Sequence, residues 1–203
     1  MRTLFEQYLG KRKTDIIIAV LELADSYGIR GITTKKIAEK VGFVEGALYK
    51  HIDSKHEAFS IILDFFEELL AARFKLINEN EMKADDALRE WFFYALQVLE
   101  KYPGIYRILF SDELYIESKD IFSKFKDIII SMTTEIRKLL EKGIVDGIFR
   151  ENLKTEIVPI GYLGVLQTVF TFWNVVEERK KGIFELAEPI FADFMNSIRA
   201  KEK

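Results

Sequence analysis

Hydrophobic residues recur along most of this 203-residue chain at the spacing of amphipathic helices. An early example places apolar residues at i, i+3, i+4 and i+7, namely Ile17, Val20, Leu21 and Ala24, with Gly28 as a stop signal. The same spacing predicts later helices at about residues 54–77, 84–101, 104–111, 117–143, 154–178 and 184–200. Because no alternating strand pattern competes, the sequence predicts an all-α protein of about nine helices.

Residues 33–51, TTKKIAEKVGFVEGALYKH, contain two short helical patterns that are separated at Gly42. Thr33 or Thr34 can cap the first helix, whose apolar face is formed by Ile37, Ala38 and Val41. Gly42 permits a tight turn, and Leu48 then points into the same small core. This arrangement is typical of a DNA-reading helix-turn-helix. Downstream, Ser54 to Glu57 fits a capping box that begins another helix.

Residues 13 to 59 resemble the DNA-binding head of the tetracycline-repressor (TetR) family of transcription regulators. The resemblance rests on Ala24, Gly28, Thr33, Thr34, Ile37, Ala38, Gly42, Gly46, Leu48, Tyr49, His51, Ser54 and Lys55. Three departures from the family pattern, Val44, Glu45 and Ile52, affect base preference rather than fold. The resemblance implies a three-helix DNA-binding domain over residues 1–56 and a larger helical ligand-sensing and dimerisation domain over residues 57–203.

The resemblance also implies which side chains contact DNA. It assigns phosphate contacts to Thr34, Tyr49, His51 and Lys55. It places nearest the major-groove base edges Glu45, Gly46, Ala47 and Lys50. With the neighbouring Thr33 and Lys35, these residues form the predicted DNA-binding set. Three of them have a structural alternative: Tyr49 as a packing residue, His51 as a helix-end residue, and Glu45 as an acid in the first turn of a helix.

Charge is unevenly distributed along the chain. Residues 1–56 hold ten Lys and Arg against seven Asp and Glu, whereas the remainder holds 20 against 26. Lys11, Arg12 and Lys13 either add phosphate contacts or are simply solvated. The chain has no cysteine, which excludes disulfides and thiolate ligands, and its first residues have no export signal, so a cytoplasmic protein is expected.

Residues 157–176 form a run of 20 residues without a charge, which is long enough to span a bilayer. Polar residues inside the run and acidic residues at both ends favour a buried helix, with membrane association as the alternative. By the resemblance, the last two helices pair with those of a second subunit in a dimeric four-helix bundle. The predicted homodimer interface comprises Gly161, Gly164 and Thr168 on one helix, and Leu186, Ile190, Phe194 and Ile198 on the other.

Aromatic residues are concentrated in the body of the chain. In the family such residues often line an effector cavity, although aromatic stripes at helical spacing also form ordinary cores. The predicted ligand-binding set is Trp91, Tyr94, Tyr106, Phe110, Phe125, Gln167, Phe170 and Trp173, which favours a mostly apolar small molecule. No cofactor or metal site is expected, since the two histidines, His51 and His56, do not share a helix face.

The predicted function is therefore a ligand-responsive repressor that binds a palindromic double-stranded DNA operator as a homodimer. A DNA-binding protein without an effector is the alternative. An enzyme is disfavoured, because the sequence has no glycine-rich phosphate loop and no serine-nucleophile elbow.

Overall fold

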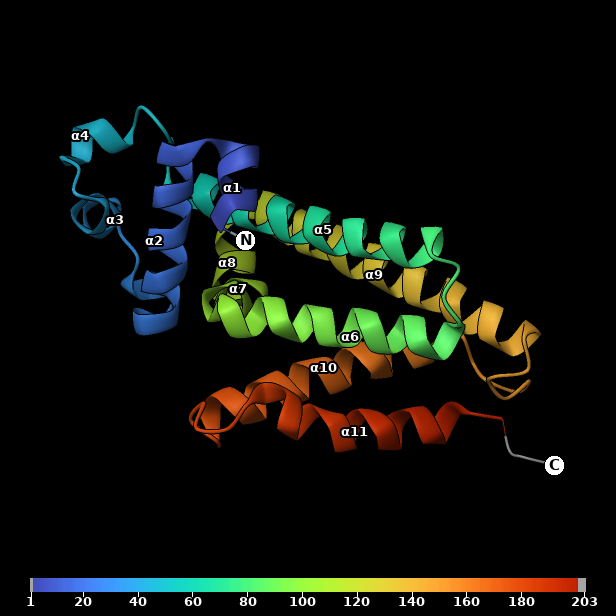
Figure 1. Ribbon diagram of the computed structural model, residues 1–203. Coiled ribbons are helices and arrows are strands. Elements are labelled where there is room, and N and C mark those ends of the chain that lie inside the picture. Colours follow the sequence, from blue (N-terminus) through green and yellow to red (C-terminus); the bar gives the residue numbers. More distant parts are fainter. Residues whose placement is uncertain (1, 201–203) are drawn as a thin grey trace. The chain divides into compact units, whose positions relative to one another are not determined.

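The computed structural model describes residues 2–200, with side chains from Phe5 onward, and it is built from helices (Figure 1). The helices are α1 (Arg2–Leu9), α2 (Lys11–Tyr27), the 3-10 helix η1 (Ile29–Gly31), α3 (Thr34–Val41), α4 (Glu45–Leu48), α5 (Lys55–Glu79), α6 (Ala84–Lys101), α7 (Pro103–Leu109), α8 (Asp112–Glu117), α9 (Lys119–Val145), α10 (Val158–Val175) and α11 (Ile183–Ile198). Over the described residues, β-structure is limited to one antiparallel bridge between Phe149 and Arg199. The all-α prediction is confirmed, and α1 and α8 are additional to the predicted helices.

Backbone contacts divide the chain into two compact units. The first contains the chain up to Leu69 together with Lys101–Ile128, and the second contains Leu70–Glu100 together with the chain from Ile129 onward. Helices α5 and α9 contribute residues to both units. The expected domain boundary between residues 56 and 57 falls inside the first unit, so a functional division at that point stays a prediction.

In the first unit, α1 is held by the aromatic side chain of Phe5. This ring is fully buried, stacks on Phe65 with centroids 3.7 Å apart, and meets Tyr102 edge-on at 5.7 Å. Gly10, with φ at 74°, turns the chain from α1 into α2. An eight-residue helix is too short to be stable alone in water, so these tertiary contacts account for α1.

Helices α2 and α7 approach each other closely within the first unit. Gly104 of α7 lies directly against the Leu21 carbonyl of α2, where a Cβ atom would be only 2.1 Å from the oxygen. Arg30 in η1 adds an ion pair to Glu113 of α8, with Nε and Oε2 2.9 Å apart. The segment that contains α7 and α8 is therefore attached to the three-helix head.

The core of the second unit contains a cluster of aromatic side chains. Trp91 is buried and stacks on Phe74 with centroids 4.9 Å apart. Tyr162 is also buried, and its hydroxyl donates to the Leu88 carbonyl at 2.5 Å. Burial raises the pKa of the Tyr162 hydroxyl well above its usual value, so this group stays protonated and keeps its hydrogen bond.

Helix α10 is shorter than the expected span of 154–178. It begins at Val158, with Pro159 in its first turn, where a missing backbone N–H costs nothing. In the part of the chain that the structure describes, no helix combines the length and the apolar character needed to cross a membrane.

Candidate DNA-binding site and effector region

The helix-turn-helix is built from local capping interactions. Thr33, rather than Thr34, is the N-cap of α3, and its hydroxyl accepts from the Lys36 backbone N–H at 3.2 Å. Gly42 ends α3 in the left-handed conformation, with φ at 74°. Only four residues form α4, and Leu48 is its fully buried anchor. The turn is therefore set by Gly42 and the position of α4 by Leu48.

The ten predicted DNA-binding residues remain open to solvent to different degrees. Those with exposed side chains or backbone are Thr33, Lys35, Glu45, Gly46, Tyr49 and Lys50, and those that are half-buried are Thr34, Ala47, His51 and Lys55. Tyr49 exposes 51% of its surface, so packing does not account for this ring. None of the ten residues is withdrawn into the core, which keeps their assignment to DNA contact open as a prediction.

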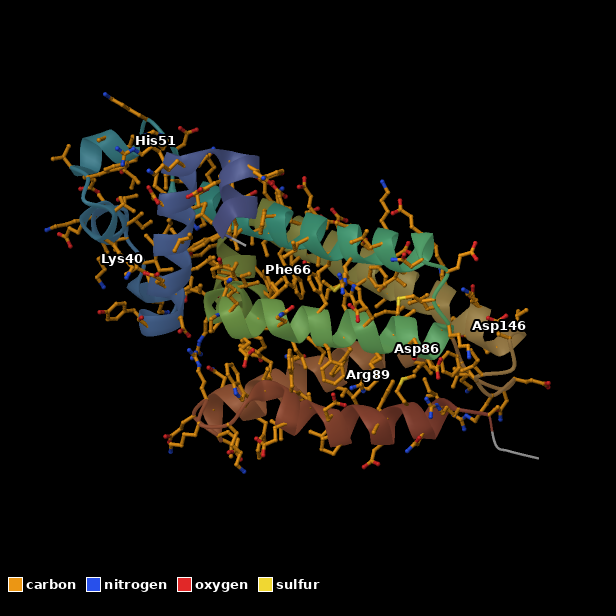
Figure 2. The ribbon with its side chains drawn as sticks, viewed as in Figure 1. Lys40, His51, Phe66, Asp86, Arg89 and Asp146 are labelled. Carbon is orange, nitrogen blue, oxygen red and sulfur yellow. The ribbon has the colours of Figure 1, made fainter. Side chains whose placement is uncertain are left out.

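Three interactions in the head were not apparent from the sequence. The Thr34 hydroxyl donates to the Glu45 carboxylate at 2.6 Å and thereby joins the N-terminal ends of α3 and α4. The His51 ring (Figure 2) stacks on Phe43, with centroids 5.8 Å apart, and the Arg12 guanidinium lies 5.7 Å from the same Phe43 ring. The basic start of α2 is thus linked through Phe43 to the residues that follow α4. Because each partner lies in a different element, spacing along the sequence gives no signal for these contacts.

The start of α5 is fixed by the predicted Ser54 cap, which is confirmed. The Ser54 hydroxyl accepts from the Glu57 backbone N–H at 3.2 Å. One oxygen of Glu57 accepts from the Asp53 N–H at 2.5 Å, and the other pairs with the Lys13 ammonium at 3.2 Å. Lys13 therefore has a structural partner, whereas Lys11 and Arg12 remain exposed.

Comparison with known proteins decides the family. No protein-family model matches the chain. The nucleoid occlusion factor SlmA of Yersinia enterocolitica is 31% identical over 138 residues, which cover 67% of this chain and 70% of SlmA. SlmA is itself a TetR-family protein. The chain belongs to the TetR family of transcriptional regulators.

Solved structures show the same fold. The ketosteroid transcriptional regulator KstR2 of Mycobacterium tuberculosis superimposes with a TM-score of 0.80 at 21% identity, over 94% of this chain and 96% of KstR2. FadR of Bacillus subtilis, in complex with stearoyl-CoA, gives a TM-score of 0.73 at 18% identity, over 92% of this chain and 100% of FadR. The expected TetR-type fold is confirmed.

The predicted ligand-binding residues of this TetR-family protein fall in both units. Tyr106, Phe110 and Phe125 belong to the first unit, where Phe110 lies 4.6 Å from Tyr106 and 6.3 Å from Phe125 between ring centroids. Tyr115 stacks on Phe125 at 4.7 Å and extends this cluster by a residue that was not predicted. The three predicted residues are therefore brought together, although their role in ligand binding stays a prediction.

In the second unit the predicted set contains Trp91, Tyr94, Gln167, Phe170 and Trp173. Phe170 and Trp173 are buried neighbours with ring centroids 5.5 Å apart, and Trp173 donates its indole N–H to the Lys181 carbonyl at 2.7 Å. Trp91 is also buried, but its indole N–H has no acceptor among the residues that the structure describes. A buried donor without a partner is costly, so Trp91 is the member of the set that most needs an acceptor from water or ligand.

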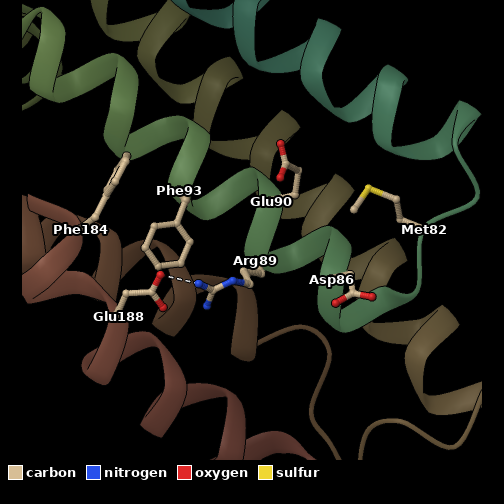
Figure 3. Close-up of a pocket in the computed structure, with 7 residues that line it drawn as sticks. All are labelled: Met82, Asp86, Arg89, Glu90, Phe93, Phe184 and Glu188. Carbon is tan, nitrogen blue, oxygen red and sulfur yellow. Dashed lines mark hydrogen bonds and ion pairs between the residues drawn. The ribbon is translucent and has the colours of Figure 1, made fainter.

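A groove of about 450 Å³ lies on the surface of the second unit (Figure 3). It is lined by Met82, Asp86, Arg89, Glu90, Phe93, Phe184 and Glu188. Arg89 pairs with Glu188 and stacks over Phe93, with its guanidinium carbon 4.6 Å from the ring centroid. None of the eight predicted ligand-binding residues lines this groove. Its residues come from α6, α11 and the turn before α6, so no local sequence pattern indicated it.

The predicted dimer interface coincides in part with an exposed apolar face of α10. Gly161, Gly164 and Thr168 are exposed, and they follow Ile157, the N-cap of α10, and Ile160, which expose 58% and 65% of their surfaces. The face continues to Phe172 and Val175. On α11, Ile190 is exposed and Leu186 and Phe194 are half-buried, whereas Ile198 is 3% exposed and packs within its own subunit.

Proposed function

We propose that this TetR-family protein is a repressor that binds a palindromic operator as a homodimer and is released by a mostly apolar small molecule. The observation that carries the proposal is the solvent-facing set on the helix-turn-helix, in which Lys35, Tyr49 and Lys50 are exposed while Leu48 anchors α4. Cations and a hydroxyl at these positions suit phosphate oxygens and base edges.

Dimerisation is supported by the face of α10. Large apolar side chains that stay exposed in a contiguous row are typical of protein interfaces. A two-fold dimer would present two reading helices to the two half-sites of a palindrome, which a single head would bind weakly.

Ile160→Asp is expected to convert the dimer to a monomer, because it would bury a charge within the α10 face. We expect dimer affinity to fall by about 100-fold or more, measured by sedimentation velocity across protein concentrations. Val145→Asp is the matched control, since Val145 is 87% exposed on α9 and lies outside the proposed interface. A variant that remains as dimeric as the wild type would remove α10 from the interface.

An apolar effector is supported by two fold relatives. KstR2 is described as a ketosteroid transcriptional regulator, and FadR of Bacillus subtilis was solved with stearoyl-CoA. A ketosteroid is largely apolar and so is the acyl chain of stearoyl-CoA, in keeping with the aromatic side chains of this chain. Effector binding changes operator affinity only through a difference in its affinity for the DNA-bound and free states.

Selection of bound sequences from a random duplex pool tests the proposal directly. Wild-type protein is expected to recover a palindrome, and a Lys50→Ala, Tyr49→Ala double variant is expected not to. The selection should be made at a stated, moderate salt concentration, because phosphate contacts make affinity strongly salt-dependent. Failure of a well-folded wild-type protein to enrich any sequence would contradict the proposed function.

Lys55→Ala is expected to weaken binding of the selected operator and of unrelated DNA alike. Loss of one phosphate contact in each half-site should reduce the slope of log affinity against log salt by about 0.9 per head. Fluorescence anisotropy at several salt concentrations measures this slope. Lys75→Ala, in the second unit, serves as the charge-matched control and should leave the slope unchanged. An unaltered slope in Lys55→Ala would contradict its assignment to a phosphate.

A second candidate is a DNA-binding protein without a small-molecule effector. It is favoured by the relative at 31% identity, which is named a nucleoid occlusion factor. Thermal melting in the presence of steroid and fatty-acyl ligands separates the two candidates, since a ligand that binds the folded state raises the melting temperature. Stabilisation with loss of operator binding supports the repressor, whereas no shift with any ligand supports the second candidate.

A further inference from the structure

One of the residues proposed to face DNA carries a carboxylate. Glu45 is the first residue of α4 and is exposed, and its Oε1 accepts a hydrogen bond from the Thr34 hydroxyl at 2.6 Å. Thr34 is the first residue of α3, so the bond ties the two helices at their N-terminal ends. A hydroxyl has a single proton to donate, and here that proton is directed at Glu45 rather than outward to a phosphate.

Stabilisation of the first turn of α4 by Glu45 does not explain the hydrogen bond between Thr34 and Glu45. The acid does lie in the first turn, where it interacts favourably with the helix dipole. Yet the hydrogen bond that the structure gives to Glu45 comes from another helix, and it fixes the direction of the carboxylate. Next to phosphates an acid is also electrostatically unfavourable, and a hydrogen-bond donor on the DNA would offset that cost.

We infer that Glu45 accepts a hydrogen bond from the exocyclic amino group of a cytosine in each half-site, and that Thr34 is the residue that positions it. This inference rests on the proposed function. Cytosine presents only its N4 amino donor in the major groove, whereas adenine places the N7 acceptor beside its N6 amino group. A carboxylate is repelled by that N7 and by the O6 and O4 acceptors of guanine and thymine. Cytosine is therefore the base that Glu45 favours.

Lys50 supplies the complementary chemistry. Its ammonium only donates, and guanine offers the O6 and N7 acceptors that suit it. Gly46 and Ala47, the other residues nearest the base edges, carry no polar side-chain atom. Direct reading by α4 and the turn that follows it is then divided between one acceptor, Glu45, and one donor, Lys50. Both select members of G·C base pairs. The half-site is expected to contain a cytosine at the position that α4 places opposite Glu45.

Sequence selection with matched variants tests the inference. Glu45→Gln keeps the size of the side chain but replaces an acceptor by an amide, which pairs with adenine N6 and N7. Wild-type protein should select cytosine at one position of each half-site, with about 10-fold or greater discrimination against the other bases. In Glu45→Gln this discrimination should fall about 10-fold or shift to adenine at that position alone, while the other positions keep their preference.

The role of Thr34 is tested by two variants. Thr34→Val removes the hydroxyl at nearly constant volume and should weaken the cytosine preference several-fold, whereas Thr34→Ser keeps the hydroxyl and should restore it. A purely structural role would instead reduce affinity for all sequences equally. Circular dichroism melts confirm that every variant is folded.

The outcomes separate the inference from the proposed function. If wild-type protein enriches no sequence, the proposed function fails and the inference fails with it. If wild-type protein selects a palindrome and Glu45→Gln selects the same palindrome with the same base preferences, only the inference is overturned. A uniform gain or loss of affinity in Glu45→Gln would likewise show that Glu45 acts through charge or helix stability alone.

Discussion

Gly104→Ala is expected to lower the free energy of unfolding by about 3 kcal/mol or more. The added Cβ would lie 2.1 Å from the Leu21 oxygen and 2.8 Å from its carbonyl carbon, so two helix backbones would have to separate. Backbone atoms cannot rotate out of the way as a flexible side chain can. Chemical unfolding followed by circular dichroism measures the change.

Gly46→Ala is the matched control for this prediction. Gly46 is also a helical glycine of the first unit, but a Cβ there would meet no atom within 4 Å. Its substitution should leave stability unchanged or raise it by up to about 1 kcal/mol, through the higher helix propensity of alanine. Equal stability of the Gly104→Ala and Gly46→Ala variants would contradict the close approach of α2 and α7.

Leu48→Ala is expected to cost about 2–5 kcal/mol and to abolish sequence-specific binding. Leu48 is fully buried and is the single buried residue of α4, a helix too short to persist without that anchor. Loss of the anchor should release Glu45 and Lys50 from the positions in which they are proposed to face the major groove of DNA. Urea unfolding and operator titration of the same sample measure the two effects.

Val44→Ala is the matched control for Leu48→Ala, because it truncates an apolar side chain that is exposed rather than buried. Val44 immediately precedes α4 and is 76% exposed, so its truncation should change stability by less than about 0.5 kcal/mol. If Leu48→Ala were as stable as Val44→Ala, the role of Leu48 as the anchor of α4 would be refuted.

The parts of the fold that could be predicted from the sequence are those fixed by neighbouring residues. Thr33 caps α3 through the Lys36 N–H, and Gly42 ends α3, because both interactions span only a few residues. The Ser54 cap of α5 is of the same kind. Capping and glycine conformation are local properties, which explains why the helix-turn-helix was visible in the sequence.

Two helices, α1 and α8, could not be predicted from the sequence. Helix α1 is stabilised by Phe5 packing on Phe65 and Tyr102, which lie 60 and 97 positions away. Helix α8 was missed because Ser111 resembles a loop residue, whereas its hydroxyl accepts from the Leu114 N–H at 3.3 Å and caps the helix. A serine can end one helix and begin the next, and sequence spacing alone does not distinguish these uses.

The candidate sites also combine features set by neighbouring residues with features set by residues far apart in the sequence. Exposure of Tyr49 and Lys50 could be inferred from helical spacing in the head. The hydrogen bond between Thr34 and Glu45 could not, because it joins two helices through a turn whose geometry has to be known first. The groove beside Arg89 could not be predicted from the sequence either. Glu188, which pairs with Arg89 there, is 99 positions away on α11.

The contact between Gly104 and Leu21 limits how the protein can be re-engineered. A chimera that exchanged only residues 1–56 would set a foreign α2 against this glycine, leave Glu113 without Arg30, and separate Phe5 from Phe65 and Tyr102. A chimera that kept these contacts would take the whole first unit from one parent, namely the chain up to Leu69 together with Lys101–Ile128. Designers who wish to redirect this regulator to a new promoter need to move both segments together.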